Sequence, residues 1–266
     1  MRGLSILREL VGRRAPDAPL ASLRTVLAGA SLLQLAEIVP VLEELGDPDL
    51  IRTPYLAHVS ALPAWAPAVL TAVWAGAGLA ALLGWRAWAA TQTLALVHVA
   101  TLFYDRQLYS NHFYFLTILS VLLALAQPRD RDPGAIPAWP LFLMRTQLSS
   151  VYLFAGLSKI QPEFLSGRVL QHYMRDTLLP GREQWYRLEV LGWVAVAVAF
   201  TEVFLAAGLW IPRVRHATLT TGFLFHVSIL VALGPSLGLV IFAVESLGVY
   251  PLFAPCGARG ARGVRA

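Results

Sequence analysis

Long blocks of apolar residues, separated by short polar stretches, run through most of the sequence. A helix that spans a bilayer needs about 20 mostly apolar residues, and a helix satisfies its backbone polar groups internally when it lies in lipid. The blocks lack the short alternating pattern of outer-membrane barrel strands. We therefore predict an all-α, polytopic membrane bundle of about eight transmembrane helices, at about 22–42, 65–84, 86–104, 109–127, 140–160, 191–211, 214–232 and 235–252.

The predicted spans divide the chain into a basic N-terminal segment (1–21), a transmembrane domain (22–252) and a basic tail (253–266). The first block continues through Gln34 and Glu37 without an obvious cleavage site, so we interpret it as a retained span and not as a signal peptide. The segment at about 161–190 is either an ordinary loop or contains an interfacial helix, with apolar positions at 165, 169 and 173.

Composition supports the membrane interpretation. Hydrophobic residues make up 57% of the 266 residues and charged residues only 14%, against roughly 25% charged residues in an average soluble domain. These values exclude a soluble globular enzyme and a disordered chain. The single cysteine, Cys256, excludes an intrachain disulfide.

The distribution of arginine predicts the orientation. With the N-terminus inside, thirteen arginines lie in cytoplasmic segments and six in outer segments, as the positive-inside rule favours. We therefore expect a multi-pass protein of the inner (plasma) membrane with both termini cytoplasmic. The net charge of +5 does not indicate a nucleic-acid partner, because topology already explains the arginines. The sequence predicts no oligomeric state.

Ionisable groups inside spans are costly, so each is a candidate functional residue. Many of the candidates lie in the outer halves of their spans, which predicts one pocket open toward the outer face. Each also has a structural interpretation: His98 and His226 could be satisfied packing residues, and Glu202 and Glu245 could be paired or protonated. The full set is Glu37, His98, Asn111, His112, Arg145, Lys159, Glu202, His226 and Glu245.

The fifth span carries a polar and partly small stripe. Arg145, Tyr152 and Lys159 are seven residues apart, and Ser149 and Gly156 share their helix face. Arginine keeps its charge, so Arg145 suits an anion or a pairing with Glu202. Lysine can lose its charge when burial disfavours the ammonium, which makes a neutral amine base possible. The alternative is that Lys159 extends to the lipid headgroups.

Other site chemistries find no support in the sequence. The histidines lack metal-ligand spacing, so we predict no metal site, and nucleotide-binding and nucleophile-elbow motifs are missing. Aromatic residues, including Tyr114, surround the polar set. They would suit a flat apolar ring such as a quinone, or they form an interfacial aromatic belt.

Two stretches carry a resemblance to a known family. Tyr109-Ser-Asn-His-Phe-Tyr114 and the R-x-Q-x4-Y-x3-G-x2-K pattern from Arg145 to Lys159 resemble the membrane domain of vitamin K-dependent γ-glutamyl carboxylases, the HTTM family. Glu163-Phe-Leu-Ser-Gly167 and Phe223-Leu-Phe-His-Val227 extend the resemblance, which covers about residues 20–255.

The resemblance implies a carboxylase chemistry in which Lys159, matching the family's proposed base, deprotonates reduced vitamin K or menaquinol. In that family the anion reacts with O2 to give a strongly basic alkoxide, which removes a γ-proton from a peptide glutamate before CO2 adds. Asn111 and His112 match the family's catalytic Asn-His pair. The further residues assigned to cofactor binding are Arg145, Tyr152, Gly156, His226, Tyr114 and Glu202.

The resemblance also has departures and alternatives. Animal carboxylases carry a large lumenal domain, and we expect this chain to be a bacterial, standalone form without it. The expected substrate is a secreted or membrane peptide at the outer face. The alternative is a non-catalytic membrane partner for maturation or export of such a peptide. A transporter is disfavoured by the lack of inverted repeats.

Overall fold

Each of the eight apolar blocks folds as a helix. The computed structural model describes residues 12–47, 52–55, 62–127, 136–174 and 187–253. Helix boundaries agree with the predicted spans to within a few residues, except that the first helix begins earlier. The elements are β1 (Arg14–Ala15), α2 (Ala18–Glu44), α3 (Ala66–Leu83), α4 (Ala87–Tyr104), η1 (Arg106–Leu108), α5 (Asn111–Ala126), β2 (Ile136–Pro137), α6 (Ala138–Ser158), α7 (Pro162–Leu165), α8 (Arg168–Tyr173), α10 (Leu188–Gly208), α11 (Arg215–Leu233), α12 (Leu237–Val249) and η3 (Tyr250–Phe253).

Several of these helices have the length and composition of membrane spans. Within the described ranges, four qualify by both criteria: Pro19–Glu44, Ala66–Leu83, Leu188–Gly208 and Arg215–Leu233. Asn111–Ala126 and Leu237–Phe253 are shorter apolar helical stretches. The prediction of an all-α bundle of membrane type is confirmed. The number of helices that cross the bilayer stays a prediction.

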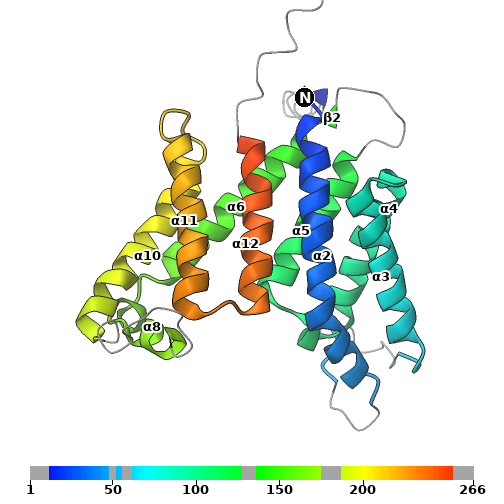
Figure 1. Cartoon of the computed structure of the whole chain (residues 1–266), viewed down its shortest axis with the longest axis horizontal. Coiled ribbons are helices and arrows are strands. Elements are labelled where there is room, and N and C mark those ends of the chain that lie inside the picture. The colour runs from blue at the N-terminus through cyan, green and yellow to red at the C-terminus, as the bar shows by residue number, and fades with distance from the viewer. Residues whose placement is uncertain (1–11, 48–51, 56–61, 128–135, 175–186, 254–266) are drawn as a thin grey trace, which may run out of the picture.

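The helices are arranged on two sides of a central pair (Figure 1). Helices α2 and α12 pack against each other at the centre, with α3 and α4 on one side and α10 and α11 on the other. Helix α6 packs against both α5 and α10. It therefore connects the two sides, and its polar stripe reaches residues that are distant in sequence.

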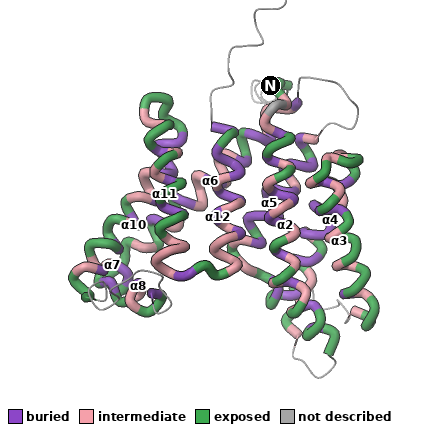
Figure 2. Tube along the Cα trace, viewed as in Figure 1, coloured by how far each residue is buried: buried purple, intermediate pink, exposed green. Residues whose placement is uncertain are grey.

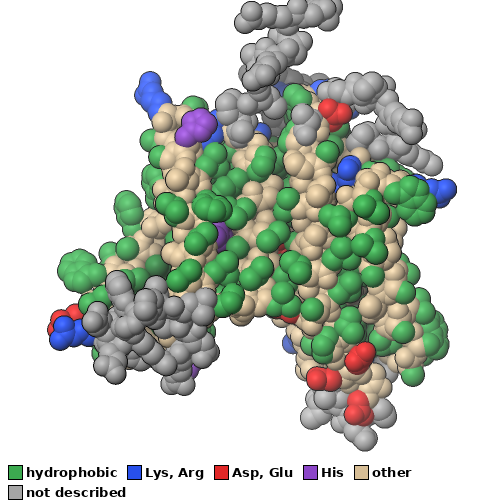
Figure 3. Space-filling model, in the orientation of Figure 1, with side chains coloured by type: hydrophobic (Ala, Val, Ile, Leu, Met, Phe, Trp, Pro, Cys, Tyr) green, Lys and Arg blue, Asp and Glu red, His purple; other side chains and the backbone are tan. Residues whose placement is uncertain are grey.

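Buried residues lie between the helices, while large apolar side chains cover outward-facing surfaces (Figures 2 and 3). Leu83, Trp193 and Phe200 are each more than 70% exposed. Helices that are apolar on all sides are stable in lipid, which solvates these surfaces as well as a protein core does. Acidic side chains gather at one end of the molecule (Figure 3), where α2 ends at Glu43 and Glu44.

Two glycines with positive φ fix the tight connections. Gly84 (φ +72°) ends α3 and allows the turn into α4. Gly167 (φ +81°) separates α7 from α8, and a Cβ at this position would lie 2.7 Å from the backbone nitrogen of Gly192 in α10. Only glycine allows both this conformation and this close approach.

The segment after α6, for which a loop and an interfacial helix were both considered, is helical in part. It contains two short helices, and their buried residues are Phe164, Leu170 and Met174, which pack against α10 around Leu191 and Ala195. Leu165 belongs to α7, whereas Val169 and Tyr173 belong to α8, so the three apolar positions do not share one continuous helix, and Tyr173 is exposed. The turn at Gly167 breaks the helical periodicity between them. An interfacial position for this segment stays a prediction. Residues 175–186 of the predicted loop lie outside the described residues.

Candidate functional site

Lys159 forms an ion pair with Glu202 between α6 and α10. Its Nζ donates a hydrogen bond to Oε1 of Glu202 at 3.0 Å and lies 2.8 Å from Oε2. The side chain of Lys159 is 25% exposed and that of Glu202 only 9%. The carbonyl of Ala155 accepts a further hydrogen bond at 3.2 Å, and the Phe164 ring centroid lies 5.8 Å from Nζ. The amine is thus held by a buried carboxylate and does not extend freely toward headgroups.

A glycine brings the two helices of this pair together. Gly156 lies just before Lys159 on α6, and a Cβ there would lie 3.0 Å from the carbonyl oxygen of Ala199 and 2.8 Å from Cγ2 of Val203. Small residues at helix crossings allow backbones to approach closely in membrane proteins. This approach places Glu202 within reach of the lysine.

Tyr152, two turns earlier on α6, lies in a buried cluster with residues of α11 and η3. Its hydroxyl is 2.8 Å from Nε2 of His226 and 2.9 Å from the hydroxyl of Tyr250. Gly222 on α11 leaves space for the Tyr250 hydroxyl, which a Cβ would overlap. His226 is therefore a bonded interior residue. Tyr250, the second partner of Tyr152, was missed because no motif or periodicity marks it.

Arg145 lies at the other end of the stripe. Its guanidinium carbon is 5.8 Å from the ring centroid of Phe253. Fourteen residues of helix separate it from Lys159, a rise of about 21 Å. The considered pairing of Arg145 with Glu202 is wrong, because Glu202 of α10 pairs with Lys159, at the opposite end of α6 from Arg145.

A second polar cluster joins α2, α5 and α12. Nε2 of His112 lies 2.5 Å from Oε2 of Glu37 and 3.1 Å from the hydroxyl oxygen of Ser110. The amide of Gln34 donates to the same Glu37 oxygen at 3.1 Å. A Cβ at Gly238 of α12 would lie 2.7 Å from Cε1 of His112, so α12 packs directly on this cluster.

The adjacent residues Asn111 and His112 point in different directions, and the histidine is the one that turns inward. Asn111 is exposed, and its Oδ1 accepts a hydrogen bond from the Tyr109 hydroxyl at 3.1 Å. Tyr114 is also exposed and its ring contacts that of Tyr109, with centroids 6.0 Å apart. Both arrangements agree with an aromatic belt at the helix ends.

His98 is fully buried and bonded on both sides. Its Nε2 is 2.9 Å from the Ser31 hydroxyl and its Nδ1 is 3.0 Å from that of Ser120. The indole of Trp74 donates to Ser31 at 2.7 Å. The packing interpretation of His98 agrees with this geometry.

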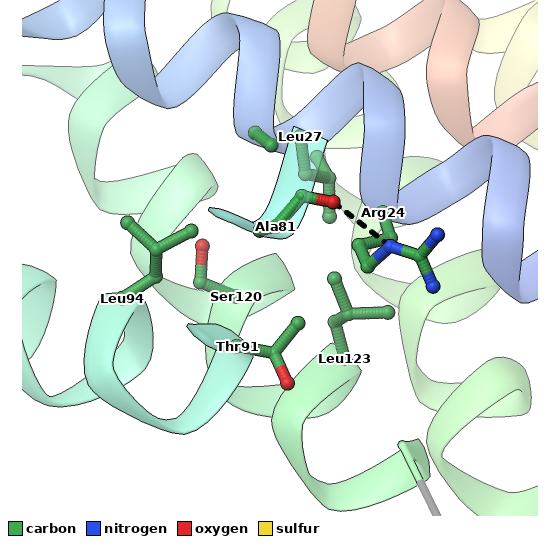
Figure 4. Close-up of a pocket in the computed structure, with 8 residues that line it drawn as sticks. Arg24, Leu27, Ala81, Thr91, Leu94, Ser120 and Leu123 are labelled. Carbon is green, nitrogen blue, oxygen red and sulfur yellow. Dashed lines mark hydrogen bonds between the residues drawn. The ribbon is translucent and has the colours of Figure 1, made fainter. Parts of the chain in front are cut away.

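A small cavity lies between α2, α3, α4 and α5 (Figure 4). Ser120, Thr91 and Leu94 line it, and Arg24 beside it donates to the carbonyl of Ala81 at 2.9 Å. Its volume of about 10 Å³ leaves room for about one water molecule. It is too small for an organic ligand.

The predicted site residues are therefore divided between separate clusters. Lys159, Gly156 and Glu202 meet at the seam of α6 and α10, and Tyr152 and His226 meet deeper in the bundle. No hydrogen bond or ion pair joins Lys159 to His112 within the described ranges. A groove of about 560 Å³ between α2 and α3, lined by Val39, Glu43, Gly46, Ala64, Pro67, Ala68, Thr71, Ala72 and Ala75, contains none of them. The single predicted pocket stays a prediction.

Two further residues of these clusters, Gln34 and Ser110, were missed by sequence reasoning as site residues. Gln34 was noted only as a polar position in the first span. Ser110 precedes α5 as its N-cap and accepts from the amide of Phe113 at 3.3 Å, so a serine before an apolar block was an available signal. Among the described residues, no group of three or more histidine, cysteine, aspartate or glutamate side chains lies together as a metal site would need.

The outer surface of the helical bundle is apolar, and its interior holds an ion pair and hydrogen-bonded histidines. These features define a polytopic helical membrane protein. A family model for the HTTM domain matches residues 13–253, so the chain belongs to the HTTM domain family, a family related to the vitamin K-dependent carboxylases. Comparison with curated proteins and with solved structures gave no match.

Proposed function

We propose that this protein is a membrane-embedded, vitamin K hydroquinone-dependent enzyme of γ-glutamyl carboxylase type, with Lys159 as the base. The observation that carries the proposal is the Lys159–Glu202 pair, because it places the only lysine of the chain against a buried carboxylate. Buried charges within membrane helices are expensive and mark functional sites by default. A lysine with a purely peripheral role would not need such a partner.

The pair can act as one base. In one form the proton is on Nζ of Lys159 and Glu202 is a carboxylate; in the other the amine and the carboxylic acid are both neutral. Burial disfavours both charges and brings the two forms closer in energy than in water. In the neutral form the amine of Lys159 can accept one further proton, which leaves an ammonium beside a neutral carboxylic acid.

The surroundings fit the hydroxyl end of a hydroquinone. Lys159 and Glu202 offer a donor and an acceptor to a phenolic oxygen, and Phe164 offers an aromatic face close to the amine. Reduced vitamin K or menaquinol would supply the electrons for O2 and, after deprotonation, the strong base that removes a γ-proton. An apolar, water-poor setting favours such chemistry, because water would quench a strong base.

His112 is the second acid–base group of the proposal. Its Nε2 is bonded to Glu37, and a carboxylate partner fixes the tautomer and orientation of an imidazole. The resemblance assigns the Asn-His pair to an oxygen of the ring, and the inward direction of His112 favours the histidine for this role. We further propose an inner-membrane location with the site toward the outer face, and a secreted or membrane peptide as substrate with CO2 as co-substrate.

The test is epoxide formation by the purified full chain in lipid nanodiscs, supplied with reduced vitamin K or menaquinol and O2. Wild type is compared with Lys159→Ala, Lys159→Arg and the control Glu189→Gln, an exposed position on α10. Lysine-dependent epoxide supports the proposal. Equal epoxide from Lys159→Ala refutes the assigned base. No epoxide from wild type, even with glutamyl peptides and bicarbonate, refutes the enzymatic function and favours a non-catalytic maturation partner.

A further inference from the structure

Glu245 on α12 is fully buried, and neither of its carboxyl oxygens has a hydrogen-bond partner among the described residues. The neighbouring Ser246 is equally buried, and its hydroxyl lies close to that of Tyr152. The chemistry proposed above uses neither residue. Buried polar groups are almost always bonded to protein or to ordered water, so the two unpartnered oxygens of Glu245 need an explanation.

The position of Glu245 on α12 lies between the partly exposed Glu37–His112 pair and the buried Tyr152–His226–Tyr250 cluster. Gly238, seven residues earlier, packs on Glu37 and His112. Tyr250, five residues later, is bonded to Tyr152. At 1.5 Å per residue, Glu245 lies about 10 Å along the axis from the first cluster and about 7.5 Å from the second.

The helix faces agree with this placement. Seven residues are almost two turns, so Glu245 shares the face of Gly238 that packs on Glu37. Ser246 is four residues from Tyr250 and shares its face. Because α2 and α12 are antiparallel, with Glu37 at Gly238 and Val26 at Gly248, the α2 residues opposite Glu245 are about 29–30. Gln34 lies opposite about residue 241, between Glu245 and the Glu37–His112 pair. The Oε1 of Gln34 is also buried without a described partner.

Electrostatics favour a neutral Glu245. The titratable groups on the elements around it are Glu37 of α2, His112 of α5, Tyr152 of α6, His226 of α11 and Tyr250 of η3. No described cation forms an ion pair with Glu245, and Glu37 is close enough for the two carboxyls to repel each other. A buried carboxylate without a counter-charge is strongly disfavoured, whereas a protonated carboxyl with water partners is not.

We propose that Glu245 is a proton-binding site that, with Ser246, Gln34 and enclosed water, forms a relay between the outward Glu37–His112 pair and the buried Tyr152–His226–Tyr250 cluster. In each transfer an O–H bond forms on one carboxyl oxygen of Glu245 while the O–H bond on the other oxygen breaks. The proton passes to the next water, and the carboxyl stays neutral. Hydrogen bonds of under about 3 Å require two or three waters on each side of Glu245 to bridge these separations.

The relay can be tested without substrate turnover, so its failure is separate from a failure of the proposed enzymatic function. Infrared difference spectroscopy on the full chain in nanodiscs, recorded on exchange from H2O to D2O, detects the C=O band of a protonated carboxyl. We expect a band that shifts in D2O and is lost in Glu245→Gln. The control Glu189→Gln should keep it. In Glu245→Asp, which keeps the carboxyl, the band should move but persist.

A second arm tests the connection to the outer pair. Glu37→Gln should slow deuteration of the Glu245 carboxyl, because it removes the charged group at the entrance, whereas Glu189→Gln should leave the rate unchanged. A Glu245 band that never shifts in D2O would overturn the relay and indicate a sealed structural carboxyl. A carboxylate band from Glu245 that responds to Na⁺ or K⁺ would overturn it in favour of a cation site.

Discussion

The ammonium of Lys159 lies within 3.0 Å of both carboxyl oxygens of Glu202, across the seam between α6 and α10. The two residues are 43 positions apart in sequence, and one of them is the only lysine of the chain. Their pairing cancels two charges inside a bundle whose outer surface is apolar. It also makes the reactivity of the lysine depend on the carboxylate, so the two residues should be tested together.

Replacing Lys159 should abolish activity while leaving the bundle folded. Lys159→Ala should lower hydroquinone epoxidation by about 10² to 10⁴-fold, the usual contribution of a general base. Lys159→Arg should fail as well, because guanidinium stays protonated at physiological pH. Epoxide yield, with thermal unfolding in detergent as a control for folding, distinguishes these effects. An active arginine variant would contradict a role as a neutral base.

Removing the carboxylate of Glu202 should cost stability as well as activity. Glu202→Ala leaves a partly buried ammonium without a counter-charge, which we expect to cost about 1–3 kcal/mol, less than for a fully buried pair because Lys159 is partly exposed. Combining it with Lys159→Met should recover part of the loss. Unfolding free energies of the two single variants and the double variant measure the coupling. Additive losses would mean that the ion pair contributes nothing to stability.

The close crossing at Gly156 should be sensitive to a single methyl group. Gly156→Ala should destabilise the protein by about 1–3 kcal/mol through overpacking against Ala199 and Val203 of α10. Gly76→Ala is the matched control, because a Cβ on this α3 glycine meets no atom within 4 Å. Thermal unfolding of both variants provides the comparison. Equal melting temperatures would show that α6 and α10 do not approach as closely as described.

The Tyr152 hydroxyl should stabilise the buried cluster. Tyr152→Phe leaves His226 and Tyr250 without their shared partner, which should cost about 1–3 kcal/mol. Tyr173→Phe, at an exposed position, should change stability by less than about 0.5 kcal/mol. Denaturant or thermal unfolding in detergent measures both. A neutral Tyr152→Phe variant would indicate that water replaces the hydroxyl.

Asn111 and His112 should behave differently although they are adjacent. His112→Ala should weaken binding of a quinone analogue, measured by tryptophan fluorescence in nanodiscs, because the imidazole turns inward to Glu37. Asn111→Ala should leave this binding unchanged, because its side chain faces outward to Tyr109. Loss of binding in Asn111→Ala alone would reverse the assignment of the two residues.

The sequence by itself determined the helices and the face on which α6 carries its polar residues. Apolar blocks of about 20 residues specify helices in lipid, because a single segment can satisfy all of its backbone hydrogen bonds there only as a helix. The seven-residue spacing of Arg145, Tyr152 and Lys159 specifies one face because a helix repeats every 3.6 residues. Both properties depend on local geometry, so they can be read from a single segment.

Only the tertiary structure decided which partner each polar residue meets. Periodicity within α6 does not encode that Glu202 of α10 binds Lys159, that Tyr250 binds Tyr152, or that Arg145 lies far from Glu202. Apolar helix surfaces are interchangeable in lipid, so the neighbours of a helix depend on close crossings such as the one at Gly156. These crossings join segments that are distant in sequence, which is why the different partners of Lys159 and His112 became visible only once the helices were placed together.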